Sequence, residues 1–314
     1  MFDEAGMLLL NSASMNPLNS MLAAILPIFP RWLIKPFAKP YVAGESMTEA
    51  LQHIKVLNEN GFAVTVDILG EHVQTREEAS KITKSYTEIL NAIAEQGLDC
   101  NISIKPTHIG LDISYETARD NLFSLLAQAK NKNNFVRIDM ENSSYTDASI
   151  KMYLEAMVHY QNVGPVIQAY LHRSPDDISR LNGEKLNVRI CKGIYKESET
   201  IALKNKSDIN DQYVDLVKAI LNGGGYAGIA THDLTLINAL DDWIIENQIS
   251  PDRFEFQILY GVPMAGRLEE LLEKGYKVRQ YVPYGEEWFD YSVRRLKENP
   301  VIITYVFKNM FKSR

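Results

Sequence analysis

The sequence predicts an α/β protein folded as a TIM-like (β/α)8 barrel, preceded by short N-terminal helices. From residue 61 onward, eight short runs rich in β-branched residues alternate with longer amphipathic stretches, which is the pattern of βα units in a parallel sheet. Polar residues stand at almost every predicted strand end, where the active sites of barrel enzymes lie. The 314 residues are 46% hydrophobic and 23% charged, a balance that allows a large buried core.

The predicted elements follow one another regularly along the chain. The strands are residues 62–69, 101–105, 135–139, 165–170, 187–191, 226–231, 254–259 and 277–282. The helices between them are residues 76–96, 115–130, 147–161, 208–221, 235–247 and 267–274, and 286–299 follow the last strand. The interval before the fifth strand leaves room only for a short helix at 175–181. We therefore expect an N-terminal helical segment at 1–44 and a barrel with a C-terminal helix at 45–314.

Composition excludes several classes of protein. With 33 basic and 40 acidic residues the net charge is −7, so electrostatic binding to nucleic acid is not expected. Cys100 and Cys191 form no C-x-x-C pair, and the six histidines are scattered, so neither a disulfide scaffold nor a metal site is predicted. These features favour a cytoplasmic location.

The two chain ends leave the question of membrane contact open. Apolar residues at 7–10 and 21–29 are too short and too interrupted for a spanning helix, and Asp3 and Glu4 stand where a signal peptide would be basic. Peripheral contact through residues 22–33 remains an alternative to helices packed on the barrel. The tail at 305–314 mixes basic and aromatic residues, which suits either a packed helix or an anionic membrane surface.

A literal G-x-G-x-x-G is formed by Gly223, Gly225 and Gly228. In dinucleotide-binding folds this motif follows a strand and opens a helix. Here it follows a predicted helix and leads into a strand. We therefore interpret it as a helix stop and turn.

The predicted strand ends bring polar groups to one rim of the barrel. The residues at these ends are Asp67, Glu71, Lys105, Asp139, Gln168, Arg189, Lys192, Thr231, His232, Leu259 and Tyr281. Lys105 could be a lysine that reaches out of the rim, a Schiff-base lysine or a cation that binds a carboxylate. An acid beside it at Asp139 would keep it charged, which favours binding of an anion.

Arg294 and Arg295 lie on the last predicted helix, with Glu298 four and three residues further on. This spacing by itself favours an ion pair on a solvated helix face. The alternative is a pair of guanidinium groups that clamp a carboxylate at the rim.

Eight sequence strings occur in order and are together more specific than any one of them. They are Ile-Ser-Ile-Lys-Pro-Thr, Arg-Ile-Asp-Met-Glu, Val-Ile-Gln-Ala-Tyr, Arg-Ile-Cys-Lys-Gly, Ala-Thr-His-Asp, Phe-Glu-Phe-Gln, Arg-Gln-Tyr-Val-Pro-Tyr-Gly and Tyr-Ser-Val-Arg-Arg-Leu-Lys-Glu-Asn. Over about residues 45–300 the chain resembles the monofunctional bacterial proline dehydrogenases. The resemblance implies a distorted barrel that uses FAD to oxidise L-proline to 1-pyrroline-5-carboxylate and passes electrons to a membrane quinone. We expect a separate pyrroline-5-carboxylate dehydrogenase downstream, because the chain is too short for the aldehyde dehydrogenase domain of the bifunctional relatives.

The resemblance also assigns roles to residues that match the family's motifs. For substrate binding it implies that Lys105, Arg294 and Arg295 hold the carboxylate and that Leu259 and Tyr281 pack on the ring. It makes Asp139 the partner of the lysine, Glu298 an acid near the arginines, and Glu71 the acid that pairs with Arg294 to close the site. Arg189 would lie beside flavin N5, and Gln168 would form a hydrogen bond with the isoalloxazine. The further residues in FAD-contacting segments are Met140, Lys192, Gly193, Ile194, Tyr195, Thr231 and His232. Ile194 stands where the family usually has alanine.

Two other classes of protein remain as alternatives. A Schiff-base lyase built on Lys105 would be colourless and inactivated by borohydride. A non-catalytic barrel would be stabilised by a carboxylated metabolite without turnover. Hydroxyproline as substrate, the identity of the quinone and the oligomeric state stay open.

Overall fold

A computed structural model describes residues 35, 40–181, 183 and 185–298, with the side chains of 294–298 excepted. Most of the predicted N-terminal helical segment and the whole of the basic-aromatic tail therefore lie outside the described residues. Within the described part of the chain, no helix is both long and apolar enough to cross a bilayer.

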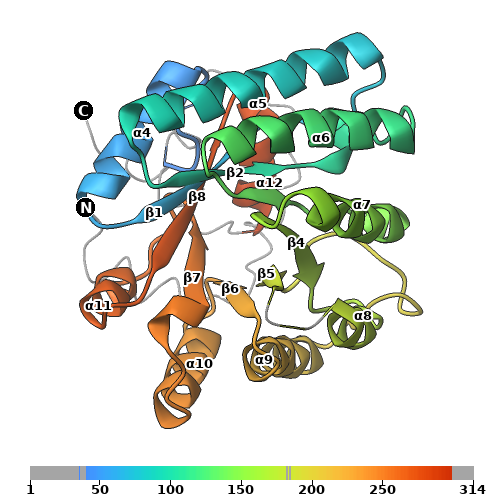
Figure 1. Ribbon diagram of the computed structural model, residues 1–314. Coiled ribbons are helices and arrows are strands. Elements are labelled where there is room, and N and C mark those ends of the chain that lie inside the picture. Colours follow the sequence, from blue (N-terminus) through green and yellow to red (C-terminus); the bar gives the residue numbers. More distant parts are fainter. Residues whose placement is uncertain (1–34, 36–39, 182, 184, 299–314) are drawn as a thin grey trace.

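Eight parallel strands form a closed barrel in sequence order (Figure 1). The strands are β1 (Ala63–Ile68), β2 (Cys100–Ile104), β3 (Val136–Ile138), β4 (Val163–Gln168), β5 (Asn187–Cys191), β6 (Tyr226–Ala230), β7 (Phe254–Leu259) and β8 (Val278–Tyr284). Pairing of β8 with β1, in which Tyr281 lies opposite Thr65, closes the barrel. The predicted fold class is confirmed, and each predicted strand is present with small differences in its bounds.

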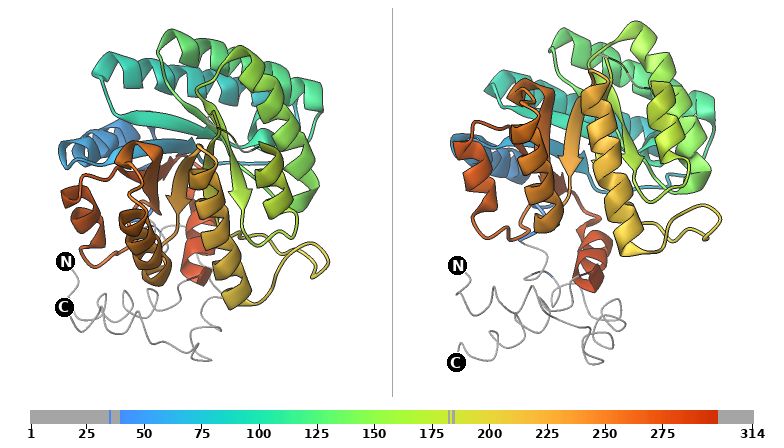
Figure 2. Two further views of the ribbon diagram at one scale, coloured as in Figure 1. Left: turned by 60° about the horizontal axis from the view of Figure 1, so that its bottom comes forward. Right: turned by 90° about the horizontal axis from the view of Figure 1, so that it is seen from below.

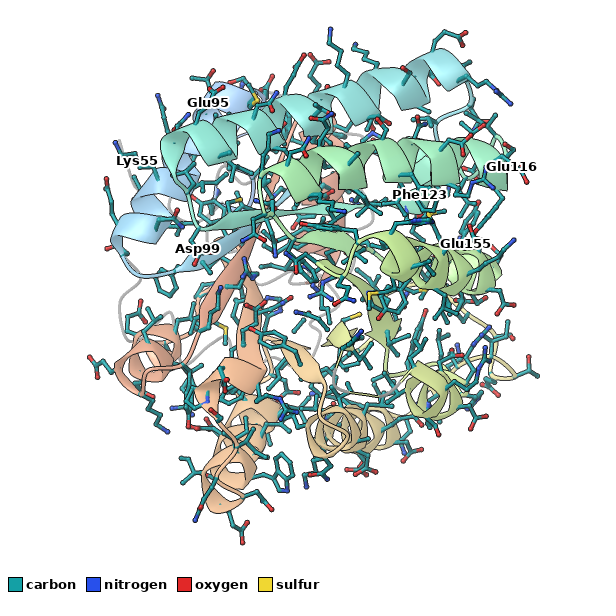
Figure 3. The ribbon with its side chains drawn as sticks, in the orientation of Figure 1. Lys55, Glu95, Asp99, Glu116, Phe123 and Glu155 are labelled. Atoms are coloured by element: carbon teal, nitrogen blue, oxygen red, sulfur yellow. The ribbon has the colours of Figure 1, made fainter. Side chains whose placement is uncertain are left out.

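Helices surround the barrel, as Figure 1 shows in projection. They are α4 (Met47–Glu59), α5 (Arg76–Gln96), α6 (Tyr115–Asn131), α7 (Thr146–His159), α8 (Ser174–Leu181), α9 (Lys206–Asn222), α10 (Leu234–Glu246), α11 (Arg267–Glu273) and α12 (Trp288–Glu298). Short 3₁₀ turns lie at η2 (Pro106–Ile109), η3 (Ser143–Tyr145) and η4 (Pro251–Arg253). On their outer faces charged side chains such as Lys55, Glu95 and Glu116 point away from the strands (Figure 3).

The barrel departs from a regular repeat at its closure. Helix α4, which precedes β1, packs against both β1 and β8 on the outside of the barrel. Helix α12, which follows β8, lies instead at one end of the barrel (Figure 2). The sequence predictions missed α4, although its start carries a capping box in which Ser46 and Glu49 satisfy each other's backbone N–H groups. Because α4 covers the outside of β8, α12 lies near the rim of the barrel and not on its outer wall.

Strand periodicity separates a polar interior from an apolar shell. Side chains of a strand alternate between its two faces. Val64 and Val66 of β1 belong to the apolar core, whereas Thr65 accordingly faces the barrel interior, where it donates a hydrogen bond to Asn101 at 2.5 Å. The same alternation sends the buried Arg137 of β3 inward. The barrel therefore holds a polar network where many barrels hold branched apolar side chains.

The glycine motif has the structural role predicted for it. Gly223 is the C-terminal cap of α9, and Gly224 beside it adopts a left-handed φ of 89°. Gly228 lies within β6. The motif thus runs from the end of a helix into a strand, the reverse of a dinucleotide-binding loop.

Candidate active site

The carboxyl ends of the strands bring five predicted site residues to one rim of the barrel, where they are buried or half-buried. These residues are Lys105, Asp139, Gln168, Arg189 and Tyr281. Lys105 immediately follows β2 and caps η2, and Asp139 follows β3 directly. The remaining three lie in β4, β5 and β8. Their convergence is what the barrel geometry predicts for an active site.

Arg189 is held on two edges of its guanidinium group. Its Nη1 donates to Asp139 Oδ1 at 2.8 Å and to Ser103 Oγ at 3.2 Å. Its Nε donates to Gln257 Oε1 at 2.6 Å. Only 6% of Arg189 is exposed. A planar guanidinium with fixed contacts on both edges has little freedom to rotate.

Asp139 accepts hydrogen bonds on both of its carboxylate oxygens. Ser103 Oγ donates to Oδ1 at 2.7 Å, beside the Arg189 contact, and Tyr281 OH donates to Oδ2 at 3.0 Å. Burial, together with the negative charge of Asp139, raises the pKa of Tyr281 well above its usual value. Tyr281 therefore remains a neutral phenol, a hydrogen-bond donor that cannot act as a base near neutral pH.

Lys105 is paired with Asp67 and remains charged. Its Nζ donates to Asp67 Oδ2 at 2.5 Å, and Tyr86 OH donates to the other oxygen at 3.1 Å. Burial opposes the lysine charge, but the carboxylates of Asp67 and Asp139 outweigh it and raise the pKa of Lys105. A charged lysine is a poor imine former, so this environment favours binding of an anion.

The predicted pairing of Lys105 with Asp139 is corrected by this geometry. The hydrogen bond of Lys105 goes to Asp67, which the sequence placed on the rim without assigning it a role. Strand β2 lies between β1 and β3, so Lys105 has a carboxylate on either side. The oxygens of Asp139 already accept from Ser103, Arg189 and Tyr281, and Asp139 acts on Lys105 through its charge.

Gln168 has a buried acceptor with no partner among the described residues. Its Nε2 donates to the backbone oxygens of Met140 at 3.1 Å and Glu141 at 2.7 Å, which fixes the orientation of the amide. Its Oε1 is buried and makes no hydrogen bond there. Such an orphan costs about 1–3 kcal/mol unless a donor reaches it. Gln168 therefore presents an acceptor suited to a donor group of a bound molecule.

The loops after β5 and β6 are joined beside this network. Lys192 Nζ donates to Asp233 Oδ2 at 2.7 Å, and His232 Nε2 accepts from the backbone N–H of Leu259 at 3.0 Å. Gly193 has a left-handed φ of 110°, and a Cβ added there would lie 2.2 Å from the Tyr170 ring. Only glycine fits this position. The predicted residues Thr231 and Tyr195 lie in the same two loops, and Ile194 is 55% exposed.

The carboxylate clamp is only partly described. Arg294, Arg295 and Glu298 belong to α12, whose helix lies at an end of the barrel (Figure 2), but their side chains lie outside the described part of the structure. Their roles stay predictions. Leu259 is in register with Tyr281 on neighbouring strands, so these two side chains have adjacent positions at the rim.

Glu71 lies on the loop after β1 near a second group of polar residues. Potential ligand atoms of Glu71, His72 and Glu141 lie within 4.8 Å of one another. Glu141 accepts from Thr107 N at 2.9 Å and from Thr107 Oγ1 at 2.5 Å, and His72 Nδ1 contacts Asp112 at 2.7 Å. Protein donors thus organise this group, and its geometry carries no metal assignment.

Sequence reasoning missed Ser103 and Gln257, which both accept hydrogen bonds from Arg189. Each lies two positions before a predicted strand-end residue, Lys105 and Leu259 respectively, and so shares its inward direction. The available signal was the alternation of polar with apolar residues, Asn101 with Ser103 in one strand and Glu255 with Gln257 in the other. Active sites of barrel enzymes lie at the strand ends, so the layer beneath them was not predicted.

Together the closed barrel and the ionised network at the carboxyl ends of its strands define a TIM-barrel enzyme with a buried, charged active site. A family model described as proline dehydrogenase matches residues 50–303. The chain belongs to the proline dehydrogenase family, and it is accordingly an oxidoreductase of the first step of proline catabolism.

Individual relatives agree with this family. Proline dehydrogenase 1 of Bacillus subtilis subsp. natto is 38% identical over 276 residues, which cover 88% of this chain and 91% of that protein. Proline dehydrogenase of Deinococcus radiodurans is 31% identical over 281 residues, covering 88% and 90%. A crystal structure of proline utilization A from Bdellovibrio bacteriovorus, inactivated by N-propargylglycine, superposes with a TM-score of 0.81 at 25% identity. That match covers 90% of this chain and 37% of the other chain.

Proposed function

We propose that the protein oxidises L-proline to 1-pyrroline-5-carboxylate with bound FAD as the immediate electron acceptor and a membrane quinone as the final one. The observation that carries the proposal is the arrangement at the rim, where the charged Lys105 and the doubly anchored Arg189 both interact with Asp139. The family of the chain supports the choice of proline as substrate.

The residues present fit a flavin. The unpartnered Oε1 of Gln168 would accept a hydrogen bond from a ring N–H of the isoalloxazine. Arg189 would place a fixed positive charge beside the reactive part of the ring system. Lys192, Gly193, Thr231 and His232 lie on the two joined loops that would hold the rest of the cofactor, with Met140, Ile194 and Tyr195 as further contacts. Gly193 allows the Tyr170 ring to approach the backbone of the first of these loops.

The substrate carboxylate would bind to cations that the chain supplies. Lys105 is charged and half-buried, and its hydrogen bond to Asp67 directs the ammonium group. We propose Arg294 and Arg295 of α12 as the second and third cations, with Glu298 and Glu71 as acids that pair with them. Leu259 and Tyr281 would pack against the pyrrolidine ring.

The protein contributes orientation and electrostatics to the reaction. Bound FAD supplies a two-electron acceptor for the hydride that leaves C5 of proline as a C=N bond forms. The amine must be neutral when the hydride leaves, and Asp139 has three donors on its oxygens while Tyr281 is a neutral phenol. Neither group is arranged as a base, so we assign loss of the amine proton to solvent on binding. Lys105 and Arg189 then position the reactants.

We propose that electrons pass from FAD to a quinone at a membrane surface. Contact with a quinone-containing membrane would use residues 22–33 or the tail at 305–314, both outside the described residues. The product would pass to a separate pyrroline-5-carboxylate dehydrogenase. Flotation with quinone-containing liposomes, compared between the full chain and a variant lacking 305–314, tests the role of the tail. Equal flotation of the two proteins would show that the tail is not needed for membrane contact.

Anaerobic reduction by proline tests the proposed reaction itself. The protein reconstituted with FAD should be yellow, and L-proline should bleach it in the absence of oxygen. D-proline is the matched control, because it carries the same groups in the wrong arrangement for the clamp. Failure to bind FAD, or a flavin that L-proline leaves oxidised, would contradict the proposal.

The two alternative functions, a Schiff-base lyase and a non-catalytic binding protein, predict different results with the same purified protein. A Schiff-base enzyme would be inactivated by borohydride in the presence of substrate, with added mass on Lys105. A binding protein would gain thermal stability with proline while its flavin stayed oxidised.

A further inference from the structure

Gly228 occupies an inner position of β6 where a larger side chain would collide with a neighbour. It is in register with Arg189 on β5 and with Glu255 on β7. A Cβ added at Gly228 would lie 2.6 Å from Gln257 Nε2 and 3.1 Å from Gln257 Cδ. Its φ is not in the left-handed region, so the backbone conformation does not require glycine. The amide of Gln257 therefore occupies the space that a side chain at position 228 would need.

The space at Gly228 is used by Gln257 to bridge two strands. From β7 its amide spans β6 and reaches Arg189 on β5, where Oε1 accepts from Arg189 Nε at 2.6 Å. On its other side Nε2 donates to Glu255 Oε1 at 2.6 Å. Gln257 is 4% exposed and Glu255 3% exposed. Both contacts are therefore shielded from competing water.

Glu255 determines which way the amide of Gln257 faces. Arg279 Nε donates to Glu255 Oε1 at 2.7 Å, and Tyr226 OH donates to Oε2 at 3.1 Å. Burial would raise the pKa of Glu255, but the charge of Arg279 and its hydrogen bond prevail and lower it to about 2. An ionised carboxylate only accepts hydrogen bonds, so Gln257 must turn its NH₂ to Glu255 and its oxygen to Arg189.

The contact with Gln257 completes the restraint on Arg189. Asp139 and Ser103 hold Nη1, and Gln257 holds Nε on the other edge of the guanidinium plane. Without the second edge, Arg189 could turn about its contact with Asp139. Among the hydrogen bonds of the described residues, none involves Nη2 of Arg189. This leaves the N–H groups of Nη2, on a fixed cation, for a bound molecule.

We propose that Gln257 is a positioning residue for Arg189, and that Gly228 is required because its missing side chain lets Gln257 reach across β6. Glu255 and Arg279 complete the relay by fixing the direction of the amide. The inference rests on the proposed function in one respect, namely that Arg189 faces the flavin.

Gln257→Leu tests the first half of the proposal. Leucine fills a similar volume, leaves Glu255 paired with Arg279 and removes the acceptor for Arg189 Nε. We expect normal flavin content, an altered flavin spectrum and a more negative reduction potential, because a less fixed positive charge stabilises the reduced flavin less well. The loss of one hydrogen bond to a charged group predicts a fall in kcat/KM of about 10- to 100-fold.

Gly228→Ala tests the second half without altering either partner. The added methyl group should displace the Gln257 amide and reproduce the changes in spectrum and potential. Because both variants remove the same contact, the double variant should be no worse than Gln257→Leu. Additive effects would overturn the role given to Gly228. Wild-type spectrum and potential in a folded, flavin-loaded Gln257→Leu protein, or in Gly228→Ala, would overturn the proposal.

Tyr226→Phe is the matched control. It removes the hydrogen bond from Tyr226 OH to Glu255 and leaves the contact between Gln257 and Glu255 in place. We expect reduced stability with an unchanged flavin spectrum and potential. A spectral change as large as that of Gln257→Leu would show a general loosening of the barrel and contradict a specific relay.

Crystal structures of the cofactor-free wild type and Gly228→Ala separate this inference from the proposed function. In the variant, Arg189 Nε should lose its contact with Gln257 Oε1 whether or not the protein takes up FAD. Retention of that contact in Gly228→Ala would overturn the positioning role. Failure of the wild type to bind FAD or to be reduced by proline would contradict only the proposed function.

Discussion

The interior of the barrel has two polar layers built from similar residues but arranged differently. The inner layer, defined here by Arg137, Glu255 and Arg279, lies deeper in the barrel. The rim layer, defined by Lys105, Asp139 and Arg189, lies at the carboxyl ends of the strands. Gln257 connects the two layers through Glu255 and Arg189. Both layers bury charged groups, yet only the rim layer leads to a site.

In the inner layer Arg279 and Glu255 pair with each other, and Arg137 donates to backbone oxygens, while its Nε has no partner among the described residues. Arg279 bonds to Glu255 at 2.7 Å and to Val64 O at 2.6 Å. Arg137 donates to Pro165 O at 3.1 Å and to Asn187 O at 2.7 Å. Burial and the nearby charge of Arg189 lower the pKa of Arg137 to about 9. This layer stabilises the barrel and offers no charge for a ligand.

The rim layer has the same kinds of pair but ends at groups that can serve a ligand. Lys105 lies at the rim, and Gln168 Oε1 is a buried acceptor without a partner in the described part of the chain. Depth in the barrel, and not residue type, thus distinguishes the charges that are paired inside the barrel from those that we propose to act on a ligand. Variants of the inner layer should therefore alter stability, and variants at the rim should alter turnover.

The largest effect is expected for Arg279→Met in the inner layer. It leaves the buried Glu255 without its ionic partner, which typically destabilises a protein by about 3–5 kcal/mol. The midpoint of urea unfolding should fall in both the cofactor-free and the flavin-loaded protein. Adding Glu255→Leu should restore part of the stability, because the unpaired charge is then gone. An unchanged midpoint in Arg279→Met would contradict the structural role of this layer.

A smaller effect, on turnover only, is expected for Arg294→Met and Arg295→Met. If these residues clamp the proline carboxylate, each loss removes about 1.5–3 kcal/mol of charge-assisted hydrogen bonding. This corresponds to a fall of about 10- to 150-fold in kcat/KM at about 1.4 kcal/mol per factor of ten. Flavin content and the unfolding midpoint should stay near those of the wild type. Arg189→Met is the comparison variant, since it should change the flavin spectrum as well. Near-wild-type kcat/KM in both variants would favour the alternative that these arginines form ion pairs on a solvated helix face.

The last expected effect is a pH dependence of stability that differs between the layers. The folded-state pKa of Glu255 is about 2, below its usual 4.5, so its contribution to stability is present above pH 4.5 and lost as the pH falls towards 2. The pKa of Lys105 is raised above its usual 10.5, so its contribution is present below that pH and lost as the pH rises beyond it. Urea unfolding across pH measures the loss of stability at acid pH, the acid limb, and the loss at alkaline pH, the alkaline limb. The Glu255→Leu/Arg279→Met variant should flatten the acid limb only, and an unaltered acid limb would contradict the assignment to Glu255.

Much of the fold and part of the site could be predicted from local patterns. Alternation of β-branched runs with amphipathic stretches predicted the closed barrel, because strand and helix periods are local properties of the chain. The same reasoning brought Asp139, Arg189 and Tyr281 together, since the ends of parallel strands meet at one rim. It did not predict α4 beside β1 and β8, because packing at the barrel closure depends on contacts between distant segments.

The sequence by itself determined the order of strands and helices, the inward period of the polar residues and the family of the protein. The tertiary structure decided which charges meet. Lys105 follows β2 and bonds to Asp67 and not to Asp139, although β1 and β3, at whose ends these acids lie, both neighbour β2. Gln257 reaches Arg189, 68 positions away in the chain, because β6 has a glycine between them. Pairings of this kind depend on barrel curvature, strand register and space left by a missing side chain, and these arise only when distant strands are brought together.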